Sequence, residues 1–543
     1  MRPLPRSYLM QGRKPTPPSQ DHFEPARNRS ALPLLEPDRA RIAARTHFAQ
    51  IDLGDRRRNQ RAQQIAAAVF ASDRGTITGL FTERREREAA YRLCHHDRMT
   101  PEAILKAHHH ALYQRMVYAA RSGHRLLLIE DTTSLPFNTR KGCDGLGPIG
   151  EGFTRGLFQH NTLVVAMDPE LATASDLTTR HPGREVACGS RVLGLLDQAY
   201  WARKDPPKSR TPDGRRRNQS ARKGDAQRES ARWGRAFERH QALLKAVTRE
   251  AGPRALPPVY VADRESDIFD VLRRGQEARL DLVVRAKQNR KLADIDALLL
   301  DHLGDQPVRS HRRLEVPTGR GRAVRVAELE VRTAAVSLRC PQAKGQMAGD
   351  GPPLRLNAVE LRETDASVAC AGVKEDKRVC WRLLTSLPVE DERQIDEVVE
   401  VYRRRWLVEE LHKALKTGLQ LCESQLRDAE AIKALATLKS VVAVELLDVR
   451  QRVRADPQAK LEAADADEAE RAVLESHYGP LPEGGWTLGE LLRRTAMLGG
   501  FMGRKGDGIP GWHTIWRGRL KLDLVAAGYR LAHGLAEPPW RCA

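Results

Sequence analysis

Residues 402–416 constrain the fold of this chain more than any other segment. Apolar residues recur there at helical spacing, which leaves Tyr402, Arg405, Glu409 and Lys416 on one narrow stripe of the opposite face. We therefore expect an amphipathic helix whose apolar face is buried. One carboxylate among a phenol, a guanidinium and an ammonium suits a metal-bound carboxylate that works beside a phosphate backbone.

The same stripe has a plainer interpretation. It also fits a solvated surface helix with ion pairs four residues apart, such as Glu409 with Lys413. Taken alone, the segment favours that interpretation. A metal-bound carboxylate needs further acidic ligands, so residues elsewhere in the chain must decide between the two.

Two apolar runs upstream each lead into an aspartate. Residues 125–129 run into Asp131, and residues 259–262 run into Asp263. Both runs predict buried strands, and an aspartate at a strand end is well placed to hold a metal, although it is also a common cap or turn residue. With Glu409 they make three oxygen donors of the kind that Mg²⁺ or Mn²⁺ prefers. Two such ions can drive an in-line phosphoryl displacement, but only the fold can bring residues so distant in sequence together.

The remaining pattern predicts an α/β core with additions. Further strand candidates lie between these two runs and just beyond the second, at residues 162–167, 192–199 and 280–285. Residues 290–385 alternate in strand fashion, so we expect a β-rich insertion ahead of the Glu409 helix. Beyond residue 420, long runs rich in Ala, Leu and Val predict helices.

Charge and composition restrict the partners and the compartment. A net charge of +20 favours a polyanionic partner, above all nucleic acid. We find no apolar run long enough for a membrane span and no signal-peptide core at Met1, so we expect no membrane association. The eight cysteines include no C-x-x-C pair and indicate reduced thiols. These features predict a cytoplasmic protein.

The motifs described above resemble one family. The spacing of Tyr402, Arg405, Glu409 and Lys416 is similar to the signature of bacterial DDE transposases of the IS-four family. The segments around the three acidic residues resemble the transposon-five-like members of that family in particular: Ile129–Leu135, Asp263–Ile268 and Trp406–Lys413. The resemblance covers about residues 48–530, with the motifs in order.

The resemblance implies a fold and a division into domains. The fold class is α/β: an RNase H-like, retroviral integrase-type catalytic core with a β-rich insertion, flanked by N-terminal and C-terminal helical domains. We expect the following boundaries: a disordered Pro/Arg-rich tail at 1–40, an N-terminal helical DNA-binding domain at 41–118, a first core segment at 119–289, the β-rich insertion at 290–388, a second core segment with the Glu409 helix at 389–425, and a C-terminal helical dimerisation domain at 426–543.

The resemblance also implies a chemistry. Asp131, Asp263 and Glu409 would be the catalytic metal ligands for two Mg²⁺ ions per site, with Mn²⁺ able to substitute. The activity would be cut-and-paste DNA transposition: binding of terminal inverted repeats, nicking, hairpin formation and strand transfer. The partners would be double-stranded DNA, as element ends and target, and a second copy of the chain. In a bacterial cell the DNA-bound protein would be nucleoid-associated.

A further group of residues would contact DNA. By the resemblance, Tyr402, Arg405 and Lys416 hold phosphates next to a flipped base, and Trp381 receives that base by stacking. The alternative for Trp381 is a core aromatic beside Leu383. The other predicted DNA contacts are Arg57, Arg285, Lys287, Arg290, His412 and Lys413.

Two other functions stay open. A nuclease with the same two-metal fold would cut DNA without joining it, and a retired transposase would bind DNA without catalysis. The complete acidic set Asp131, Asp263 and Glu409 argues against retirement. Joining of a 3′-hydroxyl end to target DNA would separate a transposase from a nuclease.

Overall fold

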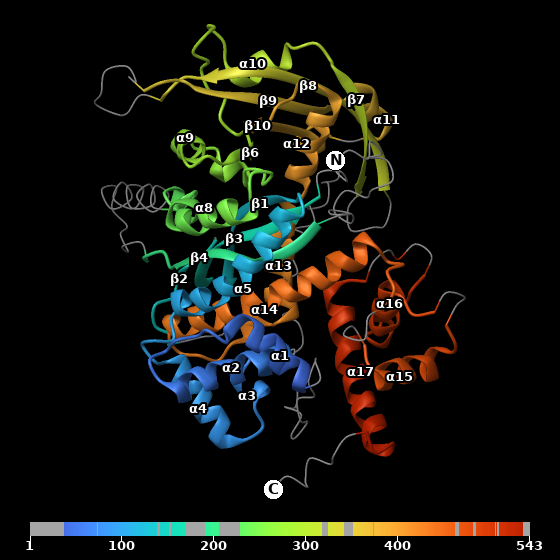
Figure 1. The fold of residues 1–543 in the computed structure, drawn as a ribbon. Helices are drawn as coiled ribbons and strands as arrows, with labels where there is room; N and C mark the ends of the chain where they lie inside the picture. Colours follow the sequence, from blue (N-terminus) through green and yellow to red (C-terminus); the bar gives the residue numbers. More distant parts are fainter. Residues whose placement is uncertain are drawn as a thin grey trace, which may run out of the picture.

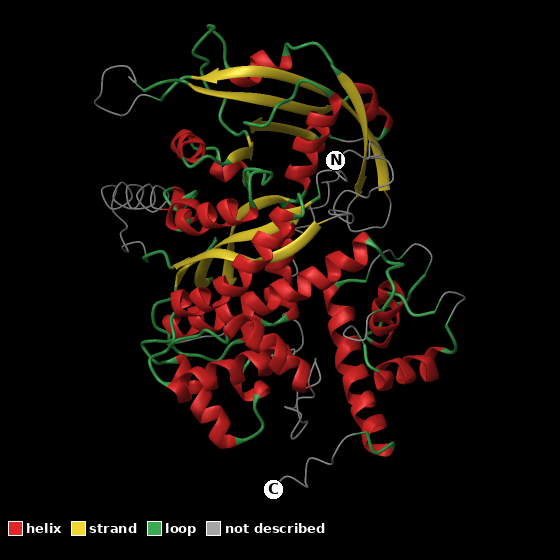
Figure 2. Ribbon diagram, in the orientation of Figure 1, coloured by secondary structure: helices red, strands yellow, loops and turns green. Residues whose placement is uncertain are grey.

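The computed structural model describes most of the chain from residue 37 onward. The described residues are 37–535, except 73, 138–141, 151–153, 169–189, 206–228, 318–323, 342–350, 373, 462–465, 482–484, 505–506 and 508–509. The predicted tail at 1–40 and the basic segment within 204–232 therefore fall largely outside the described residues. The described chain is a mixed α/β protein, with strands through its middle and upper region in Figure 2 and helices around them.

N-terminal helices form one side of the molecule, coloured blue in Figure 1. They are α1 (Pro37–Phe48), α2 (Arg56–Phe70), α3 (Ile77–Leu80), α4 (Arg84–Cys94) and α5 (Pro101–Arg121). Capping residues mark where two of these helices begin. The Asp55 side chain accepts hydrogen bonds from the backbone N–H groups of Arg57 and Arg58 at the start of α2, and Thr100 caps α5 just before Pro101. Their apolar faces join the main hydrophobic core.

Ten strands among the described residues form a single sheet. The first six along the chain are β1 (Arg125–Pro136), β2 (Gly147–Pro148), β3 (Arg155–Met167), β4 (Ser190–Trp201), β5 (Val259–Ala262) and β6 (Asp281–Arg285). At its centre β5 pairs in parallel with both β1 and β6, while β3 lies antiparallel to β1 and β4 antiparallel to β3. Helices α7 (Arg235–Arg239), α8 (Gln241–Ala251) and α9 (Phe269–Glu277) connect and cover these strands.

Two of these strands are longer than the sequence pattern predicts. The run at 125–129 was expected to end before Asp131, but β1 continues to Pro136. Its neighbour β3 begins at Arg155, ahead of the predicted start at Thr162, and the two pair along their whole lengths. Polar residues occupy these extensions, so apolar runs mark only a portion of each strand; cross-strand pairing supplies the rest.

The β-rich segment belongs to the same sheet. Its elements are α10 (Leu299–Gly304), β7 (Ser310–Pro317), β8 (Val324–Leu338), β9 (Leu354–Glu363), α11 (Asp365–Cys370) and β10 (Cys380–Thr385). Strand β10 pairs antiparallel with β6 on one side and with β9 on the other. The sheet therefore runs across the expected boundary at residue 290 without a break, and the insertion lengthens the core sheet at the top of Figure 1.

A long helix joins the sheet to the C-terminal region. The chain continues through α12 (Glu392–Arg403), α13 (Trp406–Lys413), a π-helix (Ala414–Gly418) and α14 (Ala429–Ala455), then α15 (Glu468–Tyr478), α16 (Leu488–Leu498) and α17 (Trp512–Ala532). Along much of its length α14 is buried on all sides, as expected of a helix in the middle of a large protein, and Figure 1 shows it between the sheet and the N-terminal helices.

The last helices form a small separate core. Residues of α15 and α17 bury Val473, Leu474 and Leu522 together. Helices α16 and α17 cross closely at Gly518, where a Cβ would lie 1.7 Å from the carbonyl oxygen of Thr495. Any larger residue at this position would push the two helices apart. No helix of the described chain has the length and apolar character that a membrane crossing requires.

Candidate active site

The strand register brings two of the three predicted carboxylates together. Ile129 of β1 pairs with Val261 of β5, so Asp131 and Asp263 stand two residues further along on neighbouring parallel strands. Adjacent strands are about 4.8 Å apart. The Asp131 side chain accepts the N–H of Thr132 at 2.8 Å, and Asp263 accepts the N–H of Glu265 at 2.8 Å.

Arg405 links the third carboxylate to this pair. Its Nη1 lies 3.6 Å from Oδ2 of Asp131, and its Nη2 forms an ion pair with Oε1 of Glu409. Burial first, and then the nearby carboxylates of Asp263 and Glu409, raise the pKa of Asp131 to about 7, although Arg405 opposes this shift. Asp131 thus lies beside Asp263 on the neighbouring strand and is linked to Glu409 through the Arg405 guanidinium.

The predicted helix over residues 402–416 is not continuous. Helix α12 ends at Arg403, a turn follows at Arg404, and α13 begins at Trp406. The break arises because a side chain replaces a backbone hydrogen bond of the helix. Nη1 of Arg404 donates to the carbonyl oxygen of Glu400 at 2.7 Å, and the backbone N–H of Arg404 donates to the carbonyl of Val401 instead. Arg404 itself is fully buried and donates from Nε to the hydroxyl of Ser190.

The helix ends in a π-turn that carries Lys416. The π-helix spans Ala414–Gly418, a geometry that is rare and occurs often at functional sites. Burial lowers the pKa of Lys416, an effect that Cys422 and then Asp131 oppose. The ammonium therefore lies within electrostatic reach of Asp131, as the predicted stripe requires. The apolar face is buried as predicted, with Leu407, Val408 and Leu411 at most 1% exposed.

Tyr402 and Trp381 form an aromatic pair beside the carboxylates. Their ring centroids are 5.5 Å apart in an edge-to-face arrangement. Tyr402 is buried, and its burial raises the pKa of the phenol, although Arg285 and Arg405 oppose the shift. Trp381 on β10 is partly buried, whereas its strand neighbour Leu383 is fully buried. Trp381 therefore packs against the main core with part of its surface exposed, and its stacking on a DNA base stays a prediction.

The other residues predicted to contact DNA divide into two groups. Arg57 and Lys287 are exposed, and Lys413 is 52% exposed with its Nζ 4.8 Å from the Trp406 ring centre. Arg285 is half-buried and donates from Nη2 to the carbonyl of Cys380 at 2.8 Å. For these four residues a DNA contact stays a prediction.

His412 and Arg290 are engaged inside the protein. His412 is buried and accepts a hydrogen bond from Nδ2 of Asn161 at 2.9 Å, and burial lowers its pKa to about 3. The predicted DNA contact is therefore wrong for His412, which faces the sheet. Arg290 forms an ion pair at 2.6 Å with the fully buried carboxylate of Asp267, which leaves its side chain 14% exposed.

A buried polar network behind Asp131 was missed by the sequence interpretation. Glu130 is fully buried and accepts hydrogen bonds from the Tyr260 hydroxyl at 2.8 Å and the Gly234 N–H at 3.0 Å. His160 lies 3.4 Å from Glu130, and its Nδ1 is 2.8 Å from the Thr132 hydroxyl. The polar triplet Gln159–Asn161, directly ahead of an apolar run, was the signal that could have identified it.

The donor set fits a divalent cation, although the side chains need to move. Among the described residues, no group of three or more His, Cys, Asp or Glu side chains could hold a metal ion as it stands. Arg405 lies between two of these carboxylates, Asp131 and Glu409, and supplies a positive charge there. Three carboxylates and no nitrogen or sulfur donor suit a hard cation, and the raised pKa of Asp131 shows that one guanidinium does not fully compensate them.

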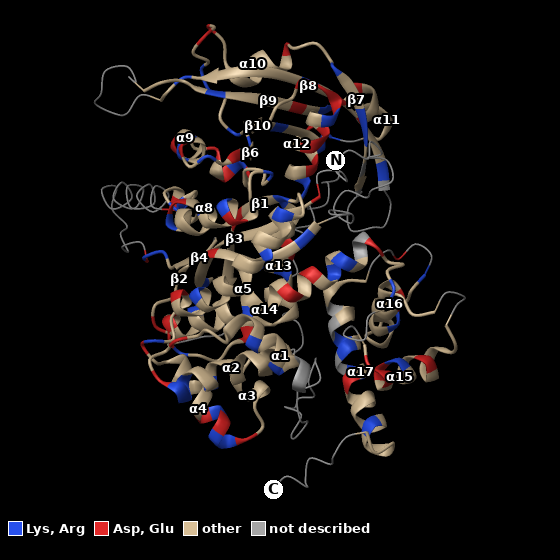
Figure 3. Cartoon of the chain, in the orientation of Figure 1, with Lys and Arg blue, Asp and Glu red and all other residues tan. Residues whose placement is uncertain are grey.

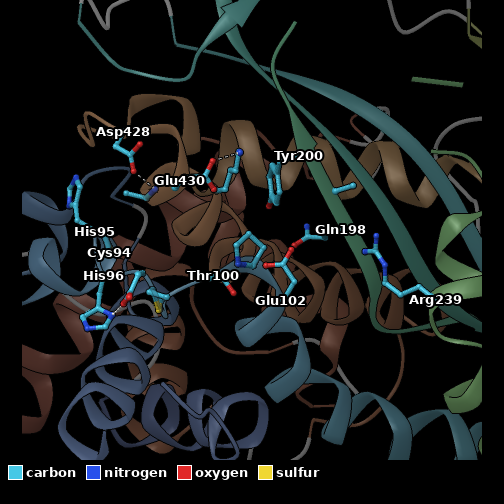
Figure 4. A pocket seen from close by; sticks show the side chains of 16 residues that line it. Cys94, His95, His96, Thr100, Glu102, Gln198, Tyr200, Arg239, Asp428 and Glu430 are labelled. Carbon is cyan, nitrogen blue, oxygen red and sulfur yellow. Dashed lines mark hydrogen bonds and ion pairs between the residues drawn. The ribbon is translucent and has the colours of Figure 1, made fainter. Parts of the chain in front are cut away.

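A cavity elsewhere in the molecule is separate from this site. It has a volume of about 380 Å³ and lies between the N-terminal helices, β4 and the start of α14; Glu102, Gln198 and Glu430 are among its lining residues (Figure 4). None of the three carboxylates lines it. The carboxylate site is instead partly open, with the Glu409 side chain 28% exposed.

Comparison with known families agrees with the geometry. The chain matches the family models described as Transposase DNA-binding at residues 40–99, Transposase DDE domain at 204–444 and Transposase Tn5 dimerisation domain at 443–538. Asp263 and Glu409 lie inside the DDE match, whereas Asp131 precedes it. A solved piggyBac transposase synaptic complex with hairpin DNA is 10% identical, with a TM-score of 0.29 over 82% of this chain and 86% of that one.

Proposed function

We propose a metal-dependent phosphoryl-transfer mechanism for this chain, which belongs to the DDE transposases related to Tn5. It is a DNA transposase that binds DNA ends and forms a homodimer, and its core is RNase H-like with helical flanks. The proposal concerns which residues perform each step of the reaction. One observation carries it: Asp131 stands beside Asp263 on neighbouring strands, and Arg405 links Asp131 to Glu409.

DDE domains use divalent metal ions, and we assign the ligands in this chain to the three carboxylates. Asp131, Asp263 and Glu409 would hold two ions, Mg²⁺ or alternatively Mn²⁺, which activate water or a 3′-hydroxyl and stabilise the leaving oxygen. Arg405 would release Asp131 and Glu409 at that stage and turn to a DNA phosphate. The guanidinium is suited to this exchange because it binds carboxylate and phosphate in the same forked geometry.

Tyr402, Lys416 and Trp381 would position the DNA. Lys416 lies in the π-helix, within electrostatic reach of Asp131, and would hold a phosphate next to the reacting bond. Trp381 keeps an exposed portion of its ring beside Tyr402 and would stack on a base drawn out of the duplex. These contacts would serve nicking, hairpin formation and strand transfer in turn.

Basic side chains of the N-terminal helices would bind the element ends. Arg56 and Arg57 at the start of α2, and Arg84 and Arg85 at the start of α4, are all exposed. Figure 3 shows basic residues on these N-terminal helices, where the DNA-binding match lies. Contacts of this kind bind phosphates and make affinity depend steeply on salt.

One face of α17 would meet the second copy. Leu524 and Val525 are each 52% exposed and Leu531 is 39% exposed on this helix. Leu524, Gly528 and Leu531 repeat at spacings of four and three residues, so they share one stripe, and no atom lies within 4 Å of a Cβ built at Gly528. Exposed leucines on a helix within the dimerisation match are best covered by the same helix of a partner.

Incubation of the full-length protein with element-end DNA and Mg²⁺ tests the proposal. Asp131→Asn, Asp263→Asn and Glu409→Gln should each lose nicking while they keep end binding, and Asp294→Asn, an exposed control, should keep both. Joined products with a 3′-hydroxyl donor exclude the nuclease alternative. Retained nicking in any of the three carboxylate variants would overturn the ligand assignment.

A further inference from the structure

Lys439 of α14 is a fully buried lysine whose ammonium is bound by backbone carbonyls. Its Nζ donates to the carbonyl oxygens of Leu419 at 2.8 Å, Gly75 at 3.0 Å and Arg74 at 3.3 Å. A buried ammonium is unfavourable unless its donors are satisfied, and three carbonyls satisfy them. A lysine in the interior of a helix that is otherwise rich in Ala, Leu and Val therefore needs a specific reason.

The three carbonyls come from two regions of the chain with different roles. Arg74 and Gly75 belong to the loop ahead of α3, inside the segment that matches the transposase DNA-binding model. Leu419 follows the π-helix that carries Lys416, and its N–H closes that turn on the carbonyl of Ala414 at 2.9 Å. One side chain of a third element thus connects the DNA-binding helices with the end of the active-site helix.

The backbone at this junction has a second unusual feature, independent of Lys439. A Cβ at Gly75 would lie 2.3 Å from the carbonyl oxygen of Gln420, so only glycine permits the approach of the two loops. Gln420 has a φ of +48°, in the left-handed region that glycine prefers. Strained backbone of this kind is kept where the surrounding structure determines it closely, and such positions cluster at functional sites.

We propose that Lys439 is a positioning residue for DNA cleavage. It fixes the N-terminal DNA-binding helices relative to the π-turn, so that DNA held by those helices meets Lys416 and the three carboxylates at a set distance. The inference rests on the proposed function, because it assumes that both regions joined by Lys439 contact DNA. Small errors of placement have large effects on rate, since the reacting groups must meet in one geometry.

Lys439→Met tests this role, because methionine keeps most of the length of the side chain without its charge or its donors. We expect affinity of the full-length protein for element-end DNA to change less than about threefold, and the rate of the first nick at saturating DNA and Mg²⁺ to fall about 30-fold or more. Lys433→Met is the matched control: the same helix carries it, and its Nζ pairs with Glu430 at 2.6 Å. The control should retain both quantities.

A second variant tests whether the two sides of the junction act together. Gly75→Ala should reproduce the nicking defect by clashing with Gln420, whereas Gly304→Ala, where nothing lies within 4 Å of an added Cβ, should not. Because Lys439→Met and Gly75→Ala open the same junction, the double variant should nick no more slowly than the slower single variant. Multiplied defects in the double variant would overturn the proposal, as would an affinity loss equal to the nicking loss.

Hydrogen exchange of the DNA-free protein separates this inference from the proposed function. In Lys439→Met, amides of residues 75–80 and 418–423 should exchange faster, with amides of β1 and β5 unchanged. Unchanged exchange at the junction would overturn the role of Lys439 whatever the protein does to DNA. Absence of nicking by the unsubstituted protein, together with the expected exchange, would instead count against the proposed function alone.

Discussion

Two partly buried carboxylates, Glu445 on α14 and Asp131 on β1, have opposite electrostatic environments. Burial alone would raise the pKa of both. At Glu445, the hydrogen bond from His47 and the charge of Arg115 outweigh burial and lower the pKa to about 2. At Asp131, Arg405 does not outweigh burial and two neighbouring carboxylates, and the pKa rises to about 7.

The contrast distinguishes a carboxylate whose charge the protein compensates from one whose charge it does not. Glu445 joins α14 to α1 and α5 through groups that the protein supplies itself, so its charge is compensated. The carboxylates of Asp131, Asp263 and Glu409, which we call the Asp131 cluster, carry more negative charge than the neighbouring cations balance. A site that receives a cation from solution is expected to be in this state. The backbone follows the same division, because α14 is one regular helix whereas α12, α13 and the π-helix are interrupted twice.

Removal of one carboxylate from the Asp131 cluster should have the largest effect on nicking. Glu409→Gln removes a ligand but keeps the shape of the side chain, and we expect nicking to fall about a thousandfold or more, because the divalent ions lose an anionic donor. Glu430→Gln on α14, 73% exposed, is the control. The measurement is single-turnover nicking of element-end DNA at saturating protein. Loss of end binding in place of nicking would contradict the contrast.

A cavity in the regular helix should affect folding and not chemistry. Leu447 is fully buried in α14, eight residues beyond Lys439, so Leu447→Ala should lower the free energy of unfolding by about 3 kcal/mol. Nicking per folded molecule should stay within about twofold of the unsubstituted rate, since the site is elsewhere. Denaturant unfolding, with nicking measured well below the midpoint, checks both quantities. A selective loss of nicking would show that α14 takes a direct role in the chemistry.

The π-turn should be sensitive at one reaction step. Lys416→Ala removes a cation near Asp131, and we expect hairpin formation to slow about tenfold or more, with end affinity reduced by much less. The matched control is Lys433→Ala on α14. Gel analysis of nicked and hairpin products over time resolves the two steps. An equal loss in affinity and in every step would make Lys416 a general phosphate contact.

Acid should lower the stability of the protein through two buried groups, His108 and Glu445. Burial, together with His47, lowers the pKa of His108 well below its usual 6.5, and Glu445 is lowered from 4.5 to about 2. In both cases the unfolded chain binds protons that the folded chain does not, so stability falls as pH drops below about 6.5 and falls further below about 4.5. Glu445→Gln should remove about 1 kcal/mol of the lower-pH contribution, because the side chain is 29% exposed. Denaturation curves from pH 7 to pH 3 should show this slope, and a flat profile would contradict it.

The features that could be predicted from the sequence are those that a pattern of neighbouring residues determines. The run at 259–262 is strand β5 without change, the apolar face of residues 407–415 is buried, and the family motifs identified the carboxylates that the register brings near one another. An apolar run or a motif spacing depends on neighbouring residues, so these features are readable along the chain.

The remaining features depend on partners far away in sequence. The break at Arg404 follows from a hydrogen bond to Ser190 and from its hold on the Glu400 carbonyl, and His412 turns inward because Asn161 meets it there. The extension of β1 past Asp131 depends on its pairing with β3. Of these partners only Glu400 lies within one helical turn of the residue it contacts, so periodicity could not reveal the others.

The position of Mn²⁺ in a structure of the protein bound to element-end DNA tests the central claim most directly. Anomalous scattering locates the ions without reference to activity. We expect Mn²⁺ within about 2.3 Å of carboxylate oxygens from Asp131, Asp263 and Glu409, with Arg405 turned away toward a phosphate. Mn²⁺ bound elsewhere, or a site in which Arg405 still joins Asp131 to Glu409, would contradict it.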